Sequence, residues 1–161
     1  MAVWARIKNM NFKELLAVSK VFIIKPRYIL PTYRATIETI RICDDLYKKE
    51  HHKNGKENAF RHALWNYLIC QKCFKISRSV EAARVWSDHF TGLHEKLSPN
   101  KKLAKAMDLH NNRFGQALFK GNDVPTEEII LLFQEKMKVA IKVSKVEEIE
   151  KTKDKLVYIE D

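Results

Sequence analysis

The sequence predicts an all-α domain, and three observations support this class. Its 161 residues suit one domain, and a composition that is 45% hydrophobic and 31% charged supplies a core without indicating disorder. Four glycines and four prolines are few for a barrel or sandwich of many short strands. Apolar residues also recur at helical spacing between capping and helix-breaking residues. We therefore predict a compact bundle of about five helices over residues 1–161.

The first segment, residues 1–34, is basic and amphipathic. Seven Lys or Arg against one Glu leave a local charge of +6, out of +10 for the whole chain. Its apolar residues lie between these charges in a pattern that predicts a short helix, which Pro26 interrupts. Two interpretations stay open: an amphipathic helix docked on its own domain, or an interfacial segment at an anionic surface.

Five longer helices are expected after this segment. Pro26 and Pro31 bracket a kinked connection to the first of them. The spacing of apolar residues then predicts helices over residues 32–49, 58–73 and 79–97. Ser79 is expected to cap the third of these helices at its N-terminus.

The C-terminal part of the chain continues this pattern. Ser98 and Pro99 are expected to provide the cap and first-turn proline of a fourth helix, which reaches about residue 119. A fifth helix begins near Pro125, and residues 156–159 form a short strand or an extended arm. Within one domain we distinguish the basic segment 1–34, a motif core over 54–119 and a charged C-terminal tail over 144–161.

The cysteines and the apolar runs exclude several classes of protein. Cys43, Cys70 and Cys73 are too few for the disulfide framework of a small secreted domain. Cys70 and Cys73 form a C-x-x-C pair at a helix end, without a second pair for zinc, so we assign them to packing. No signal-peptide core is found, and no apolar run approaches the roughly 20 residues of a spanning helix. We expect a cytoplasmic protein, or one peripheral at the membrane.

The histidines cluster in the middle of the chain, and their helical positions sort them. His62 and Asn66 lie one turn apart on the second predicted helix, opposite its main apolar stripe and on a face that is also largely apolar. A buried imidazole and amide both need partners, so this pair is either a structural network or the floor of a site. On the third helix, His94 lies at the edge of the core stripe beside Glu95, and it is a better candidate than His89.

The fourth predicted helix carries an unusual polar face. Asp108, Asn111, Asn112 and Gly115 share it, although Asp and Asn are poor helix formers. Carboxylate and amide oxygens one turn apart can hold a hard cation or orient a histidine or a water. A solvated polar face is the other interpretation.

Three ordered blocks around these residues carry a resemblance. The blocks are RHALWN at residues 61–66, HE at 94–95 and MDLHNN at 107–112. They resemble a bacterial helical domain family, without an established reaction, seen in wall-associated and polymorphic-toxin-like proteins and as short free-standing proteins. The likeness covers about residues 54–119. It implies a helical domain in which nine side chains converge: Arg61, His62, Asn66, His94, Glu95, Asp108, His110, Asn111 and Asn112.

These residues are interpreted as the site of a small hydrolase of a phosphate-bearing or lipid-linked substrate. His62 or His94 is the expected general base, and Glu95 or Asp108 orients it or holds a divalent metal ion. The toxin-like settings of the family suggest hydrolysis by context, although a housekeeping role fits this chain equally. The expected substrate-binding residues are Arg61, Asn66, Asn111 and Asn112.

Two non-enzymatic alternatives stay open. The basic N-terminal segment is typical of a module that binds an anionic partner, either a phospholipid surface or nucleic acid. Alternatively, the His and Asn residues only connect the helices of a structural partner protein.

Overall fold

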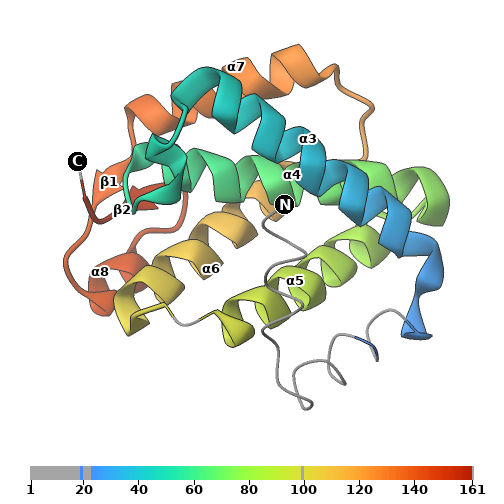
Figure 1. Cartoon of the computed structure of the whole chain (residues 1–161), viewed down its shortest axis with the longest axis horizontal. Coiled ribbons are helices and arrows are strands. Elements are labelled where there is room, and N and C mark those ends of the chain that lie inside the picture. The colour runs from blue at the N-terminus through green and yellow to red at the C-terminus, as the bar shows by residue number, and fades with distance from the viewer. Residues whose placement is uncertain (1–18, 20–22, 99, 161) are drawn as a thin grey trace.

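The computed structural model describes residues 19, 23–98 and 100–160, and over these residues it confirms the predicted all-α class (Figure 1). The predicted helix before Pro26 lies mostly outside the described residues. The helices are α3 (Ile29–Tyr47), α4 (Lys56–Ser77), α5 (Val80–Leu97), α6 (Lys102–Leu118), α7 (Thr126–Lys138) and α8 (Val146–Lys151). Two 3₁₀ turns, η1 (Pro26–Tyr28) and η2 (Glu50–His52), precede and follow α3.

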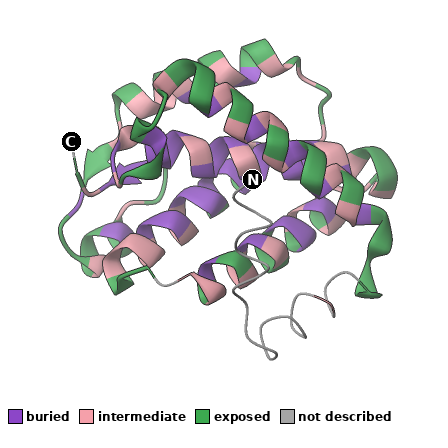
Figure 2. Cartoon of the chain, in the orientation of Figure 1, coloured by how far each residue is buried: buried purple, intermediate pink, exposed green. Residues whose placement is uncertain are grey.

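Helix α4 is the central element of the bundle. Helices α3, α5, α6 and α7 all pack against it, and it is buried along most of its length (Figures 1 and 2). As predicted, its main stripe of Phe60, Ala63, Leu64, Tyr67 and Leu68 is in the core. Its second face is buried as well, including His62 and Asn66. Polar side chains on that face can therefore find partners only on neighbouring helices.

Two predictions that involve prolines are wrong, and α4 also extends to Ser77, beyond the predicted end at residue 73. Pro31 does not belong to a kinked connection, because α3 already begins at Ile29 and Pro31 lies in its first turn. A proline is tolerated there because the first backbone N–H groups of a helix have no partner within it. Ser98 does not cap α6; it is the C-cap of α5, and its extended backbone (ψ 135°) matches the conformation that a following proline imposes.

The cap of α5 is confirmed. Ser79 has an extended backbone and its hydroxyl accepts a hydrogen bond from the backbone N–H of Ala82 at 3.2 Å. This contact fixes the start of the helix that carries His94 and Glu95 at its other end.

Gly115 sets the distance between α4 and α6. An ideal Cβ built on Gly115 would overlap the backbone of Ala63, lying 2.7 Å from its carbonyl carbon and 2.8 Å from its Cα. The two helices are therefore in backbone contact at this point, which only glycine permits. Ala63 directly follows His62, so this contact also fixes the position of that histidine relative to α6.

The charged C-terminal segment is folded onto the bundle. Strand β1 (Ile141–Lys142) pairs in parallel with β2 (Val157–Tyr158), in the region where a short strand or an arm is predicted. A second small core joins this segment to α6 through Met107, Val143, Ile149 and Val157. Beyond β2, the backbone N–H groups of Ile159 and Glu160 donate to the carbonyl of Asn54, just before α4. The end of the described chain thus supports the turn from which α4 begins.

The cysteines have the packing role predicted for them. Cys43, Cys70 and Cys73 are free thiols buried in the core. Burial raises the pKa of each to about 12, so none is a reactive thiolate near neutral pH. None of the described helices has the length and apolarity required to cross a bilayer.

Candidate functional site

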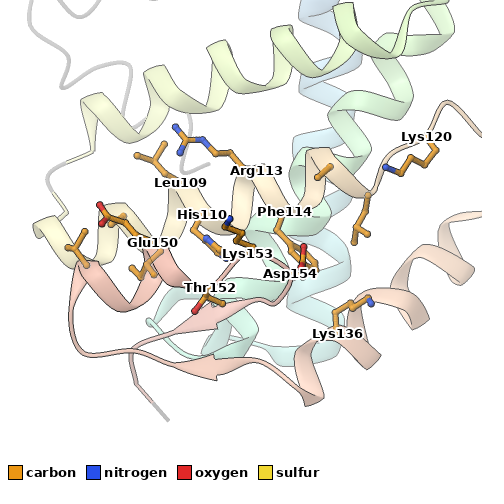
Figure 3. Close-up of a pocket in the computed structure, with 15 residues that line it drawn as sticks. Leu109, His110, Arg113, Phe114, Lys120, Lys136, Glu150, Thr152, Lys153 and Asp154 are labelled. Carbon is orange, nitrogen blue, oxygen red and sulfur yellow. The ribbon is translucent and has the colours of Figure 1, made fainter.

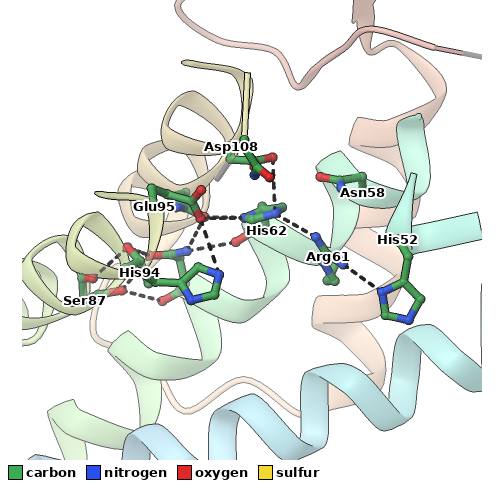
Figure 4. A network of polar contacts seen from close by, with 12 residues as sticks. His52, Asn58, Arg61, His62, Ser87, His94, Glu95 and Asp108 are labelled. Atoms are coloured by element: carbon green, nitrogen blue, oxygen red, sulfur yellow. Dashed lines mark hydrogen bonds and ion pairs between the residues drawn. The ribbon is translucent and has the colours of Figure 1, made fainter. Parts of the chain in front are cut away.

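Three helices bring most of the predicted polar residues to one buried cluster (Figure 4). Helix α4 contributes Arg61 and His62, the last turn of α5 contributes Glu95, and α6 contributes Asp108. His62 and Asp108 are each 3% exposed and Glu95 is 1% exposed. A charged or titratable group buried to this extent requires specific partners, and these determine its chemistry.

His62 is held as a neutral base by two neighbours. Its Nε2 lies 2.9 Å from Nη2 of Arg61, and its Nδ1 lies 3.0 Å from Oδ1 of Asn112. A guanidinium group can only donate, so Nε2 carries the lone pair and Nδ1–H donates to Asn112. Burial first, and the positive charge of Arg61 second, lower the pKa of His62 well below its ordinary value. The ring is therefore unprotonated at neutral pH.

Glu95 and Asp108 form a carboxyl pair beside this ring. Burial first, and the negative charge of Asp108 second, raise the pKa of Glu95 to about 8. Burial raises the pKa of Asp108 to about 6, against the opposing charge of Arg61 and the amide of Asn100, which donates to Oδ2 at 3.1 Å. Two carboxylates in one buried site cannot both ionise freely. Because the pKa of Glu95 is raised further than that of Asp108, Glu95 is the group of the pair that keeps a proton at neutral pH.

The oxygens that face the ring have few other partners. Among the described residues, no hydrogen-bond partner reaches either oxygen of Glu95 or Oδ1 of Asp108. Oδ1 of Asp108 lies 3.3 Å from Nε2 of His62, and Oε1 of Glu95 lies 3.9 Å from Nδ1 of that ring. Buried polar atoms are normally paired, and exceptions of this kind concentrate at functional sites.

Asn66 lies at the centre of a hydrogen-bond network that joins α4 to α5 and α6. It is fully buried, and its Oδ1 accepts hydrogen bonds from three side chains on α5 and α6. These donors are Ser87 at 2.8 Å, Thr91 at 3.1 Å and Gln116 at 2.8 Å. Its Nδ2 donates to Oδ1 of Asn112 at 2.7 Å, which fixes the amide that holds His62.

The buried cluster approaches the surface on two sides. His94 lies at its edge with a side chain that is 43% exposed, and its Nε2 is 3.9 Å from Oε1 of Glu95. On the other side, Nη1 of Arg61 lies 3.4 Å from Nδ1 of the exposed His52 (Figure 4). Sequence reasoning missed His52, because it lies in the turn before α4 and shares no helix face with the motif residues.

Asn111 and His110 do not join the cluster, contrary to the convergence that the motif resemblance implies. The amide of Asn111 pairs with the backbone of Val157, donating to its carbonyl at 2.9 Å and accepting from its N–H at 3.0 Å. His110 Nε2 contacts the carbonyl of Lys155 at 2.9 Å. Both side chains hold the C-terminal segment against α6, so the structure does not bring Asn111 together with the other predicted substrate-binding residues.

A metal ion could be held by the same atoms. His62, Glu95 and Asp108 each offer one ligand atom, and the three atoms lie within 4.8 Å of one another. Nδ1–H of His62 is already oriented by an amide oxygen, as in many metal-bound histidines. However, the guanidinium of Arg61 occupies the lone pair of Nε2, so an ion would have to displace it. With Arg61 in this position, its guanidinium supplies the positive charge beside His62.

A groove of about 750 Å³ lies on another face of α6 (Figure 3). It is formed by α6 and α8 with Lys136 of α7, and of the nine residues of the resemblance it contains only His110. Its basic side chains are Arg113, Lys120, Lys136 and Lys153, and its acidic ones are Glu150 and Asp154. The groove is thus separate from the buried cluster and carries a basic excess.

Comparison with known proteins identifies a family but no reaction. A family model described as a domain of unknown function (DUF6973) matches residues 19–141, which include α3 to α7 and all residues of the cluster. No curated protein and no solved structure matches the chain.

Proposed function

The chain belongs to the DUF6973 family, and we propose that it is a small hydrolase of a phosphate-bearing or lipid-linked substrate. One observation carries this proposal: Nε2 of the buried, neutral His62 lies 3.3 Å from Oδ1 of the buried Asp108, beside a second buried carboxyl group, Glu95, whose pKa is raised. A neutral imidazole that can accept a proton and a carboxylic acid whose pKa is raised toward neutrality are the two groups that hydrolysis requires.

The three groups have complementary roles in the proposed reaction. Nε2 of His62 accepts a proton from the attacking water, and the imidazolium that forms is stabilised by Asp108. Glu95, which holds the proton of the pair, donates it to the leaving group. Arg61 binds the anionic group of the substrate, and in doing so its guanidinium leaves Nε2 free to act. His94, at the exposed edge, contacts the substrate as it enters.

The context of the motif blocks supports hydrolysis as well. Wall-associated and toxin-like proteins, which these blocks resemble, commonly act by cleaving a cell component, but this is an analogy of context. We also propose a metal-assisted form, in which His62, Glu95 and Asp108 would hold a divalent ion and the ion would supply Lewis-acid activation of water.

The test compares His62→Gln with the wild type on p-nitrophenyl phosphate, a phosphodiester analogue and phosphatidylglycerol vesicles. Gln keeps a side-chain amide that can donate to Asn112 but removes the base. We expect turnover to fall about 10²–10⁴-fold. The melting temperature should stay close to that of the wild type, and the exposed His89→Ala variant should retain full activity. Full activity in His62→Gln, or no turnover by the wild type on any of the three substrates with or without added divalent metal, contradicts the proposal.

A second candidate function is binding to an anionic membrane, favoured by the basic excess of the groove and by the charge of residues 1–34. Co-sedimentation with phosphatidylglycerol vesicles should weaken steeply as salt is raised. Lys136→Glu should weaken it further, whereas Lys49→Glu, the same charge change away from the groove, should have little effect. Salt-independent binding, or stronger binding to RNA than to vesicles, excludes this candidate.

A further inference from the structure

A second group of metal-ligating side chains lies at the turn between α3 and α4. Asp44 belongs to the last turn of α3, and His51 and His52 form the end of η2. Lys48, with φ 52°, reverses the chain after α3 so that η2 lies back against that helix. Nε2 of His51 thereby comes within 2.8 Å of Oδ1 of Asp44, and the rings of His51 and His52 are 3.9 Å apart between centroids.

The three side chains offer ligand atoms at a spacing that suits one ion. One atom from each residue lies within 4.8 Å of the other two. Ligands about 2.0–2.1 Å from a tetrahedral ion are about 3.4 Å apart, so only a small contraction is needed. Asp44 and His52 are exposed and can supply that movement, while the fully buried His51 provides a fixed point.

The polar atoms of these three side chains are only partly paired by hydrogen bonds within the protein. One nitrogen of the buried His51 ring, Nδ1, has no hydrogen-bond partner among the described residues. The neighbouring Lys53 does not compete for Asp44, because its ammonium pairs with Glu50 at 2.8 Å. The carboxylate of Asp44 therefore faces His51 and solvent, which leaves room for a cation with one or more water ligands.

We propose that Asp44, His51 and His52 form a surface binding site for a transition-metal dication of the Zn²⁺ class. Two imidazole nitrogens and one carboxylate favour Zn²⁺, Co²⁺ or Ni²⁺ over Ca²⁺ and Mg²⁺, which prefer oxygen ligands. The open coordination positions distinguish the site from a closed structural zinc site. It does not depend on the proposed hydrolase activity. It is distinct from the buried cluster, and the side chain of Arg61 contacts a residue of each.

The test is calorimetric titration of the full, tag-free, chelator-treated chain with ZnCl₂. We expect one Zn²⁺ per chain at this site. His52→Ala and Asp44→Asn should each weaken its binding by more than about tenfold. His89→Ala, which removes another exposed histidine, should leave binding unchanged, as should Glu95→Gln, which alters the buried cluster. Near-UV circular dichroism of the two ligand variants checks that the fold is retained.

The outcomes separate the two clusters. Zn²⁺ binding that survives both His52→Ala and Asp44→Asn but is lost in Glu95→Gln places the ion in the buried cluster and overturns the proposal. Absence of Zn²⁺ binding by the wild type overturns it as well. Two ions per chain, one lost in His52→Ala and the other in Glu95→Gln, support the surface site. Since the readout is binding rather than turnover, failure of the hydrolase assay does not affect it.

Discussion

The Gly115→Ala variant is expected to lose about 3 kcal/mol of folding stability, at the upper end of the usual cost of overpacking. The added methyl group would overlap the carbonyl oxygen of Ala63, which is backbone and cannot rotate away. Helices α4 and α6 would have to separate, and this separation would also move Asn112 away from His62. The higher helix propensity of alanine, worth up to about 1 kcal/mol, offsets only part of this loss.

Urea unfolding followed by circular dichroism measures this effect, and Gly92→Ala is the matched control. Gly92 lies within α5, and a Cβ added there would meet nothing within 4 Å. The same substitution should therefore stabilise the protein by up to about 1 kcal/mol. If both variants had the stability of the wild type, the backbone contact between α4 and α6 would not exist in solution.

The Glu95→Gln variant is expected to be more stable than the wild type at alkaline pH and to lose hydrolytic activity. The pKa of Glu95 is raised to about 8 in the folded protein, above its ordinary value of 4.5. Between these values the folded state binds more protons than the unfolded state, so this group makes stability fall as pH rises from about 4.5 to about 8. Glutamine cannot ionise and removes this dependence. We expect a gain on the order of 3 kcal/mol at about pH 9 and little difference near pH 4.

Urea unfolding of wild type and variant across this pH range tests the prediction. Glu81→Gln, on the exposed first turn of the same helix, is the control for loss of a carboxylate and should follow the wild type. A stability difference between Glu95→Gln and the wild type that does not change with pH would show that Glu95 is already ionised. Stabilisation together with loss of activity is the pattern expected of a group kept for function at the expense of folding.

Much of the fold could be predicted because it depends on local pattern. The two apolar faces of α4 follow from helical spacing, and the cap at Ser79 follows from its position before an apolar run. The roles of Pro31 and of Ser98, which precedes Pro99, are predicted wrongly because a proline near a helix is compatible with two roles. It can begin a helix or separate two helices, and the choice depends on where the preceding helix ends.

Helical spacing predicts which site residues share a face of a helix, but it does not predict which neighbouring element that face meets. His62 and Asn66 share a face, and that face does meet α5 and α6. Asn111 and Asn112 are neighbours that point about 100° apart, and sequence alone does not show which of them faces α4 and which faces the C-terminal segment. Ser87 and Gln116, which hold Asn66, carry no motif signal because their contacts with Asn66 are made between helices and leave no pattern along the sequence.

The hydrogen bonds from Ile159 and Glu160 to Asn54 have a consequence for biosynthesis. Domains begin to fold while they are still being synthesised, from the N-terminus onward. Here the turn that precedes α4 obtains its backbone partners from residues translated more than a hundred codons later. A nascent chain that has not yet emerged from the ribosome as far as residue 160 therefore lacks the support for the helix that carries Arg61 and His62.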